Sequence, residues 1–297
     1  MTGALGGGLT SFGAPRFPTE RIELIWHGID HAEGLAIDAD GTVWCGGEEG
    51  QVYRGLLDGE PQQVAAVPGR TLGFALDGSG NAYCASYAEA GVFRITPGGR
   101  VDRISTGAPE LPAELPNQPA FLPSGVLVFT DSGVWGKHDG RIYAVGVEGT
   151  TRVVDTSACR FPNGLAVSPD GRALAVVESA LPGVSLLSIG ENGSLAAREV
   201  LVELPGTVPD GVAYDEQGRL LISCWAPDAI FVLAPDGELS ILAHDPLRYV
   251  LHEPTNVAFV PGTSRLVTAN YGERFLSVLE HDAPGAPLPR PEFPWRP

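Results

Sequence analysis

Residues 161–171 read FPNGLAVSPDG, and this short segment decides how the rest of the chain is interpreted. Asn163, an oxygen-bearing residue, precedes a glycine, a brief apolar run follows, and a Ser-Pro-Asp-Gly turn ends the segment. The same frame returns as HAEGLAID at residues 31–38 and as VPDGVAYD at residues 208–215. Self-similarity over such distances indicates a repeat architecture, so the period of the repeat has to be determined first.

The frame occurs six times, and each copy contains an alanine in its apolar run. The steps between successive alanines are 39, 45, 46, 47 and 45 residues, which is the length of a four-stranded propeller blade. The six alanines are Ala36, Ala75, Ala120, Ala166, Ala213 and Ala258.

Each repeat continues in the same order, with a glycine-containing turn, a β-rich run, an alternating run and a more polar fourth run. The last repeat lacks its fourth run, whereas residues 21–26 form a strand-like run before any complete unit. We therefore predict an all-β chain, residues 1–297, folded as a single six-bladed β-propeller with four antiparallel strands per blade. The N-terminal strand would close the ring in the last blade. Residues 1–20 and the proline-rich residues 283–297 are expected to be peripheral or poorly ordered tails.

Composition narrows the partners. The formal net charge of −17 argues against nucleic acid and against anionic membrane surfaces, which leaves a small molecule as the expected partner. No window approaches 18 consecutive apolar residues, and residues 1–18 do not resemble a signal peptide. Cys45, Cys84, Cys159 and Cys224 lack metal-like spacing and are expected to be free thiols in a reducing compartment. We expect a cytoplasmic protein that is a monomer or a weak homo-oligomer.

The residue three positions before each alanine is the candidate functional position. First strands line the channel of a propeller, so these six residues should meet at one level around its axis. Four of them carry carboxylate or amide oxygens, and such groups converge at low cost only around a cation. Oxygen ligands favour Ca²⁺, with Mg²⁺ or Mn²⁺ as alternatives, and Zn²⁺ is less favoured because no His or Cys is present. The six residues are Glu33, Leu72, Asn117, Asn163, Asp210 and Thr255.

A purely structural explanation exists for Asn and Asp before glycine, since both are turn formers. Glu33 is a poor turn former, however, and the matching register of four residues favours the metal interpretation.

These motifs resemble those of the gluconolactonase/regucalcin (senescence marker protein) family, whose wider relatives include diisopropylfluorophosphatase and paraoxonase. The resemblance rests on EGLA at residues 33–36, on FPNGLA at 161–166 with its SPDG turn, and on PDGVA at 209–213. It implies a six-bladed propeller with one divalent cation in the channel and hydrolysis of lactones or related esters. It also implies that Glu33, Asn163 and Asp210 are core ligands, that Asn117 is a fourth ligand or a substrate contact, and that Asp210 is the catalytic base or nucleophile.

One departure from the family bears on the substrate. Members that hydrolyse aldonolactones usually have an Arg two residues before the position of Asn117 and an Asp directly after it. Here Leu115 and Gln118 occupy those positions, so a less polar substrate is expected.

The loops that follow the second strands should surround the metal, because antiparallel second strands end where first strands begin. Aromatic residues there could form an apolar wall or could simply pack between blades. The loop histidine His138 could transfer protons or be solvated. Residues 133–140 form the longest such loop and a candidate lid. The predicted substrate-binding residues are Asn117, Asp131, Trp135, His138, Arg160, Trp225 and Tyr271.

Three functions are therefore in competition. The first is a divalent-metal-dependent hydrolase of lactones or related esters. The second is a non-hydrolytic propeller enzyme, similar to strictosidine synthase or to a natural-product cyclase or isomerase. The third is a binding scaffold of WD40 type, which the polar channel residues disfavour.

Overall fold

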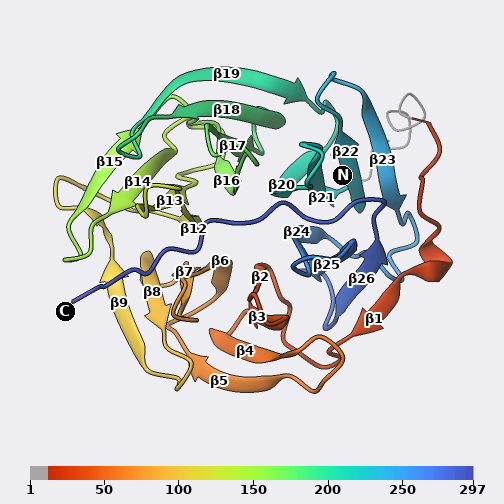
Figure 1. The fold of residues 1–297 in the computed structure, drawn as a ribbon, viewed down its shortest axis with the longest axis horizontal. Coiled ribbons are helices and arrows are strands. Elements are labelled where there is room, and N and C mark those ends of the chain that lie inside the picture. The colour runs from red at the N-terminus through yellow and green to blue at the C-terminus, as the bar shows by residue number, and fades with distance from the viewer. Residues whose placement is uncertain (1–12, 297) are drawn as a thin grey trace.

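The computed structural model describes residues 13–296, which form a ring of six four-stranded antiparallel sheets (Figure 1). This confirms the predicted six-bladed β-propeller. Innermost strands of neighbouring blades contact one another around the whole ring. All six repeated alanines lie on these innermost strands, as the sequence period predicted. Besides the 3₁₀ turn η2 (Thr19–Arg21), the part of the chain described here contains only strands and connections.

The blades follow one another in chain order, each running from the channel outward. The first blade comprises β2 (Leu35–Ile37), β3 (Thr42–Gly46), β4 (Gln51–Leu56) and β5 (Gln62–Ala66). The second comprises β6 (Thr71–Leu76), β7 (Ala82–Ser86), β8 (Gly91–Ile95) and β9 (Val101–Ser105). The third comprises β12 (Pro116–Phe121), β13 (Leu127–Asp131), β14 (Arg141–Val145) and β15 (Thr151–Asp155). The fourth blade comprises β16 (Pro162–Val167), β17 (Ala173–Glu178), β18 (Gly183–Ile189) and β19 (Leu195–Glu203). The fifth comprises β20 (Val208–Tyr214), β21 (Leu220–Ala226), β22 (Ala229–Leu233) and β23 (Leu239–His244).

The sixth blade joins the two ends of the chain. It contains β24 (Pro254–Phe259), β25 (Arg265–Asn270) and β26 (Leu276–Glu280), and its outer strand is β1 (Glu23–Ile25). β1 pairs antiparallel with β26 in the register Glu23 to Val278, which confirms the predicted ring closure. A small hairpin that the repeat did not predict, β10 (Gly107–Ala108) with β11 (Leu111–Pro112), precedes the third blade.

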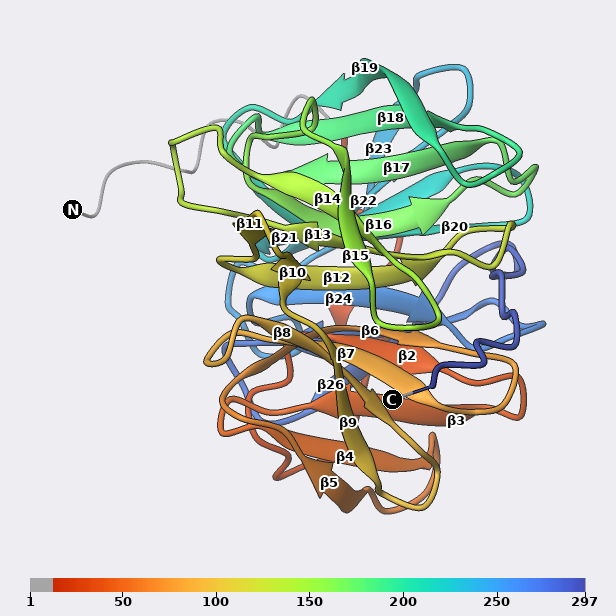
Figure 2. The same ribbon diagram turned by 90° about the vertical axis from the view of Figure 1, so that its left-hand side faces the viewer.

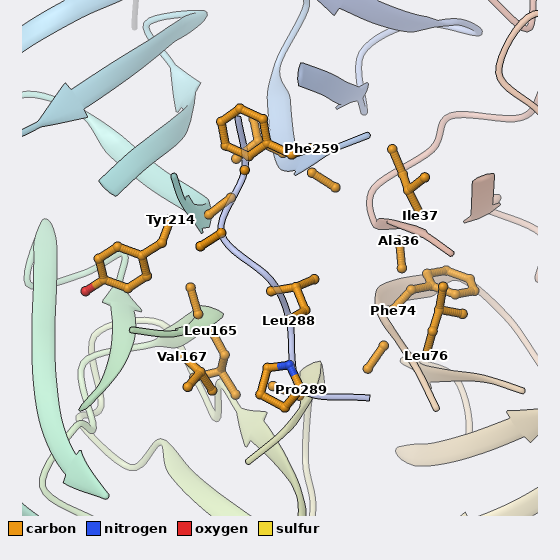
Figure 3. A pocket seen from close by; sticks show the side chains of 18 of the residues that line it. Ala36, Ile37, Phe74, Leu76, Leu165, Val167, Tyr214, Phe259, Leu288 and Pro289 are labelled. Atoms are coloured by element: carbon orange, nitrogen blue, oxygen red, sulfur yellow. The ribbon is translucent and has the colours of Figure 1, made fainter. Parts of the chain in front are cut away.

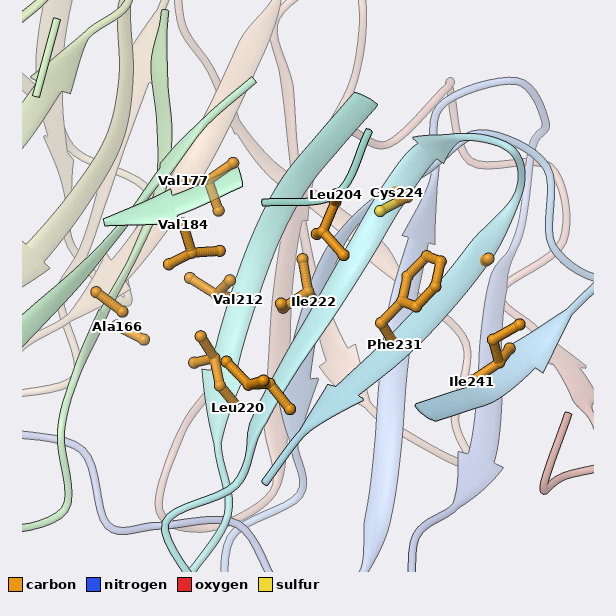
Figure 4. Packing of buried hydrophobic residues seen from close by; sticks show 13 residues of the cluster. Ala166, Val177, Val184, Leu204, Val212, Leu220, Ile222, Cys224, Phe231 and Ile241 are labelled. Carbon is orange, nitrogen blue, oxygen red and sulfur yellow. The ribbon is translucent and has the colours of Figure 1, made fainter. Parts of the chain in front are cut away.

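The hydrophobic core consists of layers between adjacent blades. Between the fourth and fifth blades, Val177 and Val184 face Val212, Ile222 and Phe231 (Figure 4). The alternation of apolar and polar residues along each strand places one apolar set on each face, and both faces of a blade are covered by its neighbours. Tight turns such as the one at Gly171, with φ of 72°, allow the chain to reverse within a few residues.

The C-terminal segment, expected to be a peripheral tail, crosses one end of the channel (Figure 1). The backbone N–H of Ala286 donates to Tyr214 O at 2.9 Å on the fifth blade, and the N–H of Gly78 on the second blade donates to Pro291 O at 2.9 Å. Phe293 then packs edge-on against Tyr83 with ring centroids 5.7 Å apart. We call residues 283–291 the strap. Figure 2 shows the strap and the β10–β11 hairpin at opposite ends of the channel.

Cys45, Cys84, Cys159 and Cys224 are all free, and Cys159 is the only one of them that is not buried. Within residues 13–296 no helix has the length and apolar character that crossing a bilayer requires.

Candidate functional site

The four predicted oxygen-bearing residues come to the end of the channel opposite the strap. Asn117, Asn163 and Asp210 lie at the beginnings of β12, β16 and β20, and Glu33 lies two residues before β2. The starts of these strands pair with the ends of the second strands, for example Pro116 with Asp131. The second-strand loops therefore surround this end, as strand order predicted, and we call it the mouth.

Glu33 and Asp210 form the electrostatic centre of the mouth. Burial raises the pKa of Asp210 well above its usual range, and the neighbouring carboxylate of Glu33 raises this pKa further. Burial likewise raises the pKa of Glu33 to about 7, against the opposing effect of Arg70. Two desolvated carboxylates with raised pKa values are unfavourable together unless a proton or a cation compensates them.

The two asparagines are held in place by a repeated device. Asn117 Nδ2 donates to Ser132 Oγ at 3.2 Å, and Ser132 Oγ donates to the carbonyl of Pro162, the residue before Asn163. In the next blade Asn163 Nδ2 donates to Ser179 Oγ at 3.4 Å, and that hydroxyl donates to Pro209 O at 2.7 Å. Asn163 also hydrogen-bonds the Asp210 carboxylate. Because the amide N–H groups are engaged, the amide oxygens remain the available acceptors.

The other two positions of the ring contribute no free oxygen. Leu72 is a buried apolar side chain, and Thr255 is buried with its hydroxyl donating to Glu33 O at 2.6 Å. Thr255 therefore fixes the backbone of Glu33. The carboxylate and amide oxygens at the mouth come from the first, third, fourth and fifth blades.

The glycines that directly follow Asn163 and Asp210 let the inner strands approach closely. A Cβ at Gly164 would lie 2.5 Å from Asp210 O, and one at Gly211 would lie 2.6 Å from Thr255 O. Neither distance is compatible with a side chain, so these glycines are required for Asn163 and Asp210 to meet.

In the third and sixth blades, which lie opposite each other in the propeller, a larger residue stands at the position of these glycines. Asn256 Nδ2 donates to Gln118 Oε1 at 3.0 Å, and Gln118 Nε2 donates to Phe74 O and to Pro119 O, each at 2.9 Å. This pair spans the channel just below Glu33, Asn117, Asn163 and Asp210. We call it the amide bridge.

A charged cluster flanks Glu33, and it contains the predicted substrate-binding residue Tyr271 together with Arg70, which the sequence pattern did not single out. Arg70 Nη2 donates to Glu48 Oε1 at 2.6 Å, and its guanidinium lies 4.7 Å from the ring centre of Tyr271. Tyr271 donates its hydroxyl to Glu48 Oε1 at 3.1 Å. The repeat could have identified Arg70. It stands two residues before Leu72 in the second blade, which is the position that Leu115 occupies before Asn117 in the third blade.

The remaining predicted substrate-binding residues lie on the mouth loops and differ in accessibility. Trp135 is 55% exposed and packs on Phe161 at a ring-centre distance of 5.0 Å, and Trp225 is 37% exposed. His138 and Arg160 are exposed. Their contact with a substrate stays a prediction.

Asp131 requires a correction. It is fully buried, and its carboxylate accepts the backbone N–H groups of Glu114 and Leu115, with Leu115 N at 2.6 Å from Oδ1. Arg141 Nε lies 3.5 Å from Oδ2. These partners and the complete burial make Asp131 a support for the segment that leads into Asn117, instead of a residue whose carboxylate faces a substrate.

The donor set at the mouth consists of two carboxylates and two amides. Across the described residues 13–296, no group of three or more His, Cys, Asp or Glu side chains is placed to hold a metal. Any cation at the ring would therefore depend on the asparagine oxygens as well, which suits hard cations such as Ca²⁺. Glu33, Asn163 and Asp210, with Asn117 as the fourth residue, fit this requirement.

Fold and site together define a six-bladed propeller with an oxygen-lined mouth. The family model described as "SMP-30/Gluconolactonase/LRE-like region" matches residues 106–268, more than half of the sequence. The chain belongs to this SMP-30/gluconolactonase-like family, which confirms the resemblance.

Two curated proteins are similar over part of their length. A gluconolactonase of Zymomonas mobilis is 32% identical over 153 residues, covering 44% of this chain and 42% of the relative. The diisopropyl-fluorophosphatase of Loligo vulgaris is 31% identical over 139 residues, covering 44% and 43%. The chain thus matches less than half the length of either relative.

Solved structures share the fold over nearly the whole chain. A gluconolactonase from Xanthomonas campestris has a TM-score of 0.74 at 20% identity, covering 87% of this chain and 89% of its own. A calcium-binding protein, regucalcin, from Agrobacterium tumefaciens has a TM-score of 0.69 at 20% identity, covering 89% and 94%.

Proposed function

We propose that the protein is a divalent-cation-dependent hydrolase of lactones or related esters, with Ca²⁺ as the first candidate cation. The observation that carries this proposal is the adjacency of the Glu33 and Asp210 carboxylates, both with raised pKa values, beside Asn163. The family membership and the names of the two curated relatives support the same reaction class. The scaffold and non-hydrolytic alternatives gain no support from these observations.

Each residue of the mouth has a part in the proposed reaction. Glu33, Asn163, Asp210 and Asn117 would hold the cation, which when bound supplies a Lewis acid for the ester carbonyl and lowers the pKa of water. Asp210 would take the proton of the attacking water, or attack the carbonyl itself, and Asn163 fixes its orientation. Ser179 in turn fixes Asn163 through its hydrogen bond.

The walls of the mouth favour a substrate of moderate polarity. Leu115 provides no charge, and the Gln118 side chain is occupied in the amide bridge. The Arg70 guanidinium is engaged by Glu48 and stacked near Tyr271. The exposed Trp135 and Trp225 add apolar surface at the rim. Alkyl or aryl lactones are therefore preferred over polyhydroxylated aldonolactones.

The test combines metal analysis with kinetics. Purified protein should contain, or bind by calorimetry, one Ca²⁺ per chain, and chelation should abolish hydrolysis in a panel of alkyl lactones, aldonolactones and phosphotriesters. Asp210→Asn should weaken cation binding and remove turnover. Glu216→Gln is the matched control, since it removes an exposed carboxylate at the opposite end of the channel. Full turnover by Asp210→Asn, or by the chelated protein, would contradict the proposal.

A further inference from the structure

The half of the channel below the amide bridge is a second chamber, distinct from the mouth. It is a cavity of about 450 Å³ enclosed by the lower halves of the inner strands, the amide bridge and the strap. Figure 3 shows its side chains converging from different blades, with Leu288 and Pro289 of the strap lying across them. Phe74, Leu76, Leu165, Val167 and Phe259 supply much of the wall.

The cavity has a polar ceiling, and the exposed carboxylate of Glu216 is among its lining residues. The amides of Gln118 and Asn256 form this ceiling, whereas the hydroxyl of Tyr214, another lining residue, points away from the cavity (Figure 3). Arg290 is also at the wall, yet its Nη1 donates to Asp38 Oδ1 at 2.8 Å and its Nη2 donates to Ile37 O. The exposed carboxylate of Glu216 and the net charge of −17 oppose an anionic guest.

The cavity reaches the surface beside the strap. Its lining includes the exposed residues Ala39, Glu216 and Pro261, and Leu288 is 54% exposed. Pro287 and Pro289 have no N–H to donate, and the bonded anchors of the strap lie on either side of them, at Ala286 and Arg290. The middle of the strap therefore rests over the opening without backbone pairing through these two prolines.

We propose that this lower chamber is a binding site for an uncharged, largely apolar small molecule, such as a medium-length alkyl alcohol or a compact polycyclic ring. The volume falls in the range of small-ligand sites, and an apolar wall with a few polar groups at one end is the usual composition of such sites. The neutral ceiling, the neutralised Arg290 and the Glu216 carboxylate select against anionic ligands. The amide bridge keeps this ligand separate from the four oxygen ligands of the mouth.

The experiment measures binding of the neutral fluorescent probe 1-aminoanthracene to the full chain. We expect saturable binding of one probe per chain, displacement by 1-decanol, and at least tenfold weaker displacement by decanoate. Ala36→Leu, whose new side chain would enter the cavity, and Leu288→Trp, which fills it from the strap, should each weaken probe binding at least tenfold. Leu247→Trp, on a loop at the mouth end and 67% exposed, is the matched control and should bind the probe as the wild type does.

Several outcomes would overturn the proposal. Absence of saturable binding would do so, as would unchanged affinity in both folded cavity-filling variants, or displacement by decanoate as strong as by decanol. Loss of probe binding in Asp210→Asn would place the probe at the mouth instead. Two variants are used because Ala36 also packs against the core, so its substitution could disturb folding, whereas Leu288 is on the strap. Circular dichroism verifies that each variant is folded.

Discussion

Ionisation of Glu33 should destabilise the cation-free protein as the pH rises from about 5 to about 8. The folded-state pKa of Glu33 is about 7, against 4.5 for an ordinary glutamate. Between these values the folded state binds more protons than the unfolded state, so the free energy of unfolding falls with increasing pH. At 1.36 kcal/mol for each pKa unit, the loss reaches at most about 3 kcal/mol once the pH exceeds 7.

The assay is thermal unfolding of chelator-treated protein at several pH values, compared with Glu33→Gln. For a chain of this size a loss of 3 kcal/mol corresponds to a fall in Tm of about 6 °C. Comparing the two proteins cancels the titration of all other groups except Asp210, whose pKa should itself fall when the Glu33 charge is removed. Glu216→Gln is the control and should follow the wild type.

Added Ca²⁺ provides the second half of this test. A cation that binds the two carboxylates should restore the stability lost at pH 8, by about 2.7 kcal/mol at a hundredfold excess over its Kd. It should have little effect on Glu33→Gln. Identical pH profiles for the wild type and Glu33→Gln would refute the reasoning, because they would show that Glu33 is not desolvated beside a second carboxylate.

Three further predictions test the scaffold around the mouth. Arg198→Met should lower the free energy of unfolding by about 3 kcal/mol in urea titrations, because it leaves the fully buried Glu178 carboxylate without its cation; a change below 1 kcal/mol would contradict this. Gly164→Ala should destabilise by about 1–3 kcal/mol and weaken Ca²⁺ binding by calorimetry, since its Cβ would displace the backbone at Asp210; unchanged Ca²⁺ affinity would oppose it. A thiol reagent at pH 8 should modify the native protein at Cys159 alone, because the other three cysteines are buried and burial raises the pKa of each; peptide mapping that finds a second modified site would refute this.

The sequence repeat was sufficient to predict most of the fold and the position of the candidate site. Six alanines at nearly constant spacing were sufficient to place every inner strand, because each blade repeats the same local chemistry. The register of the repeat also brought Glu33, Asn117, Asn163 and Asp210 to one end of the channel. Local patterns were informative wherever the structure itself is periodic.

The features that escaped prediction depend on pairs of residues that are far apart in sequence and break the repeat. Asp131 resembles any polar residue at a strand end, and only its partners Glu114 and Leu115 reveal that it is internal. The amide bridge joins Gln118 to Asn256 across the ring. The strap is proline-rich and resembles a tail, and its position depends on contacts that no local pattern encodes.

Closure of the ring by β1 also sets the order in which the molecule can be completed during synthesis. Glu23 pairs with Val278, so partners 255 residues apart must meet, and the entropy of closing such a loop is on the order of 5 kcal/mol. At typical elongation rates the β1 segment waits tens of seconds for β26 to be made. A chain stalled or truncated before Leu276 would retain five complete blades with an unsatisfied sheet edge, a substrate for chaperones and a source of aggregation in the cell.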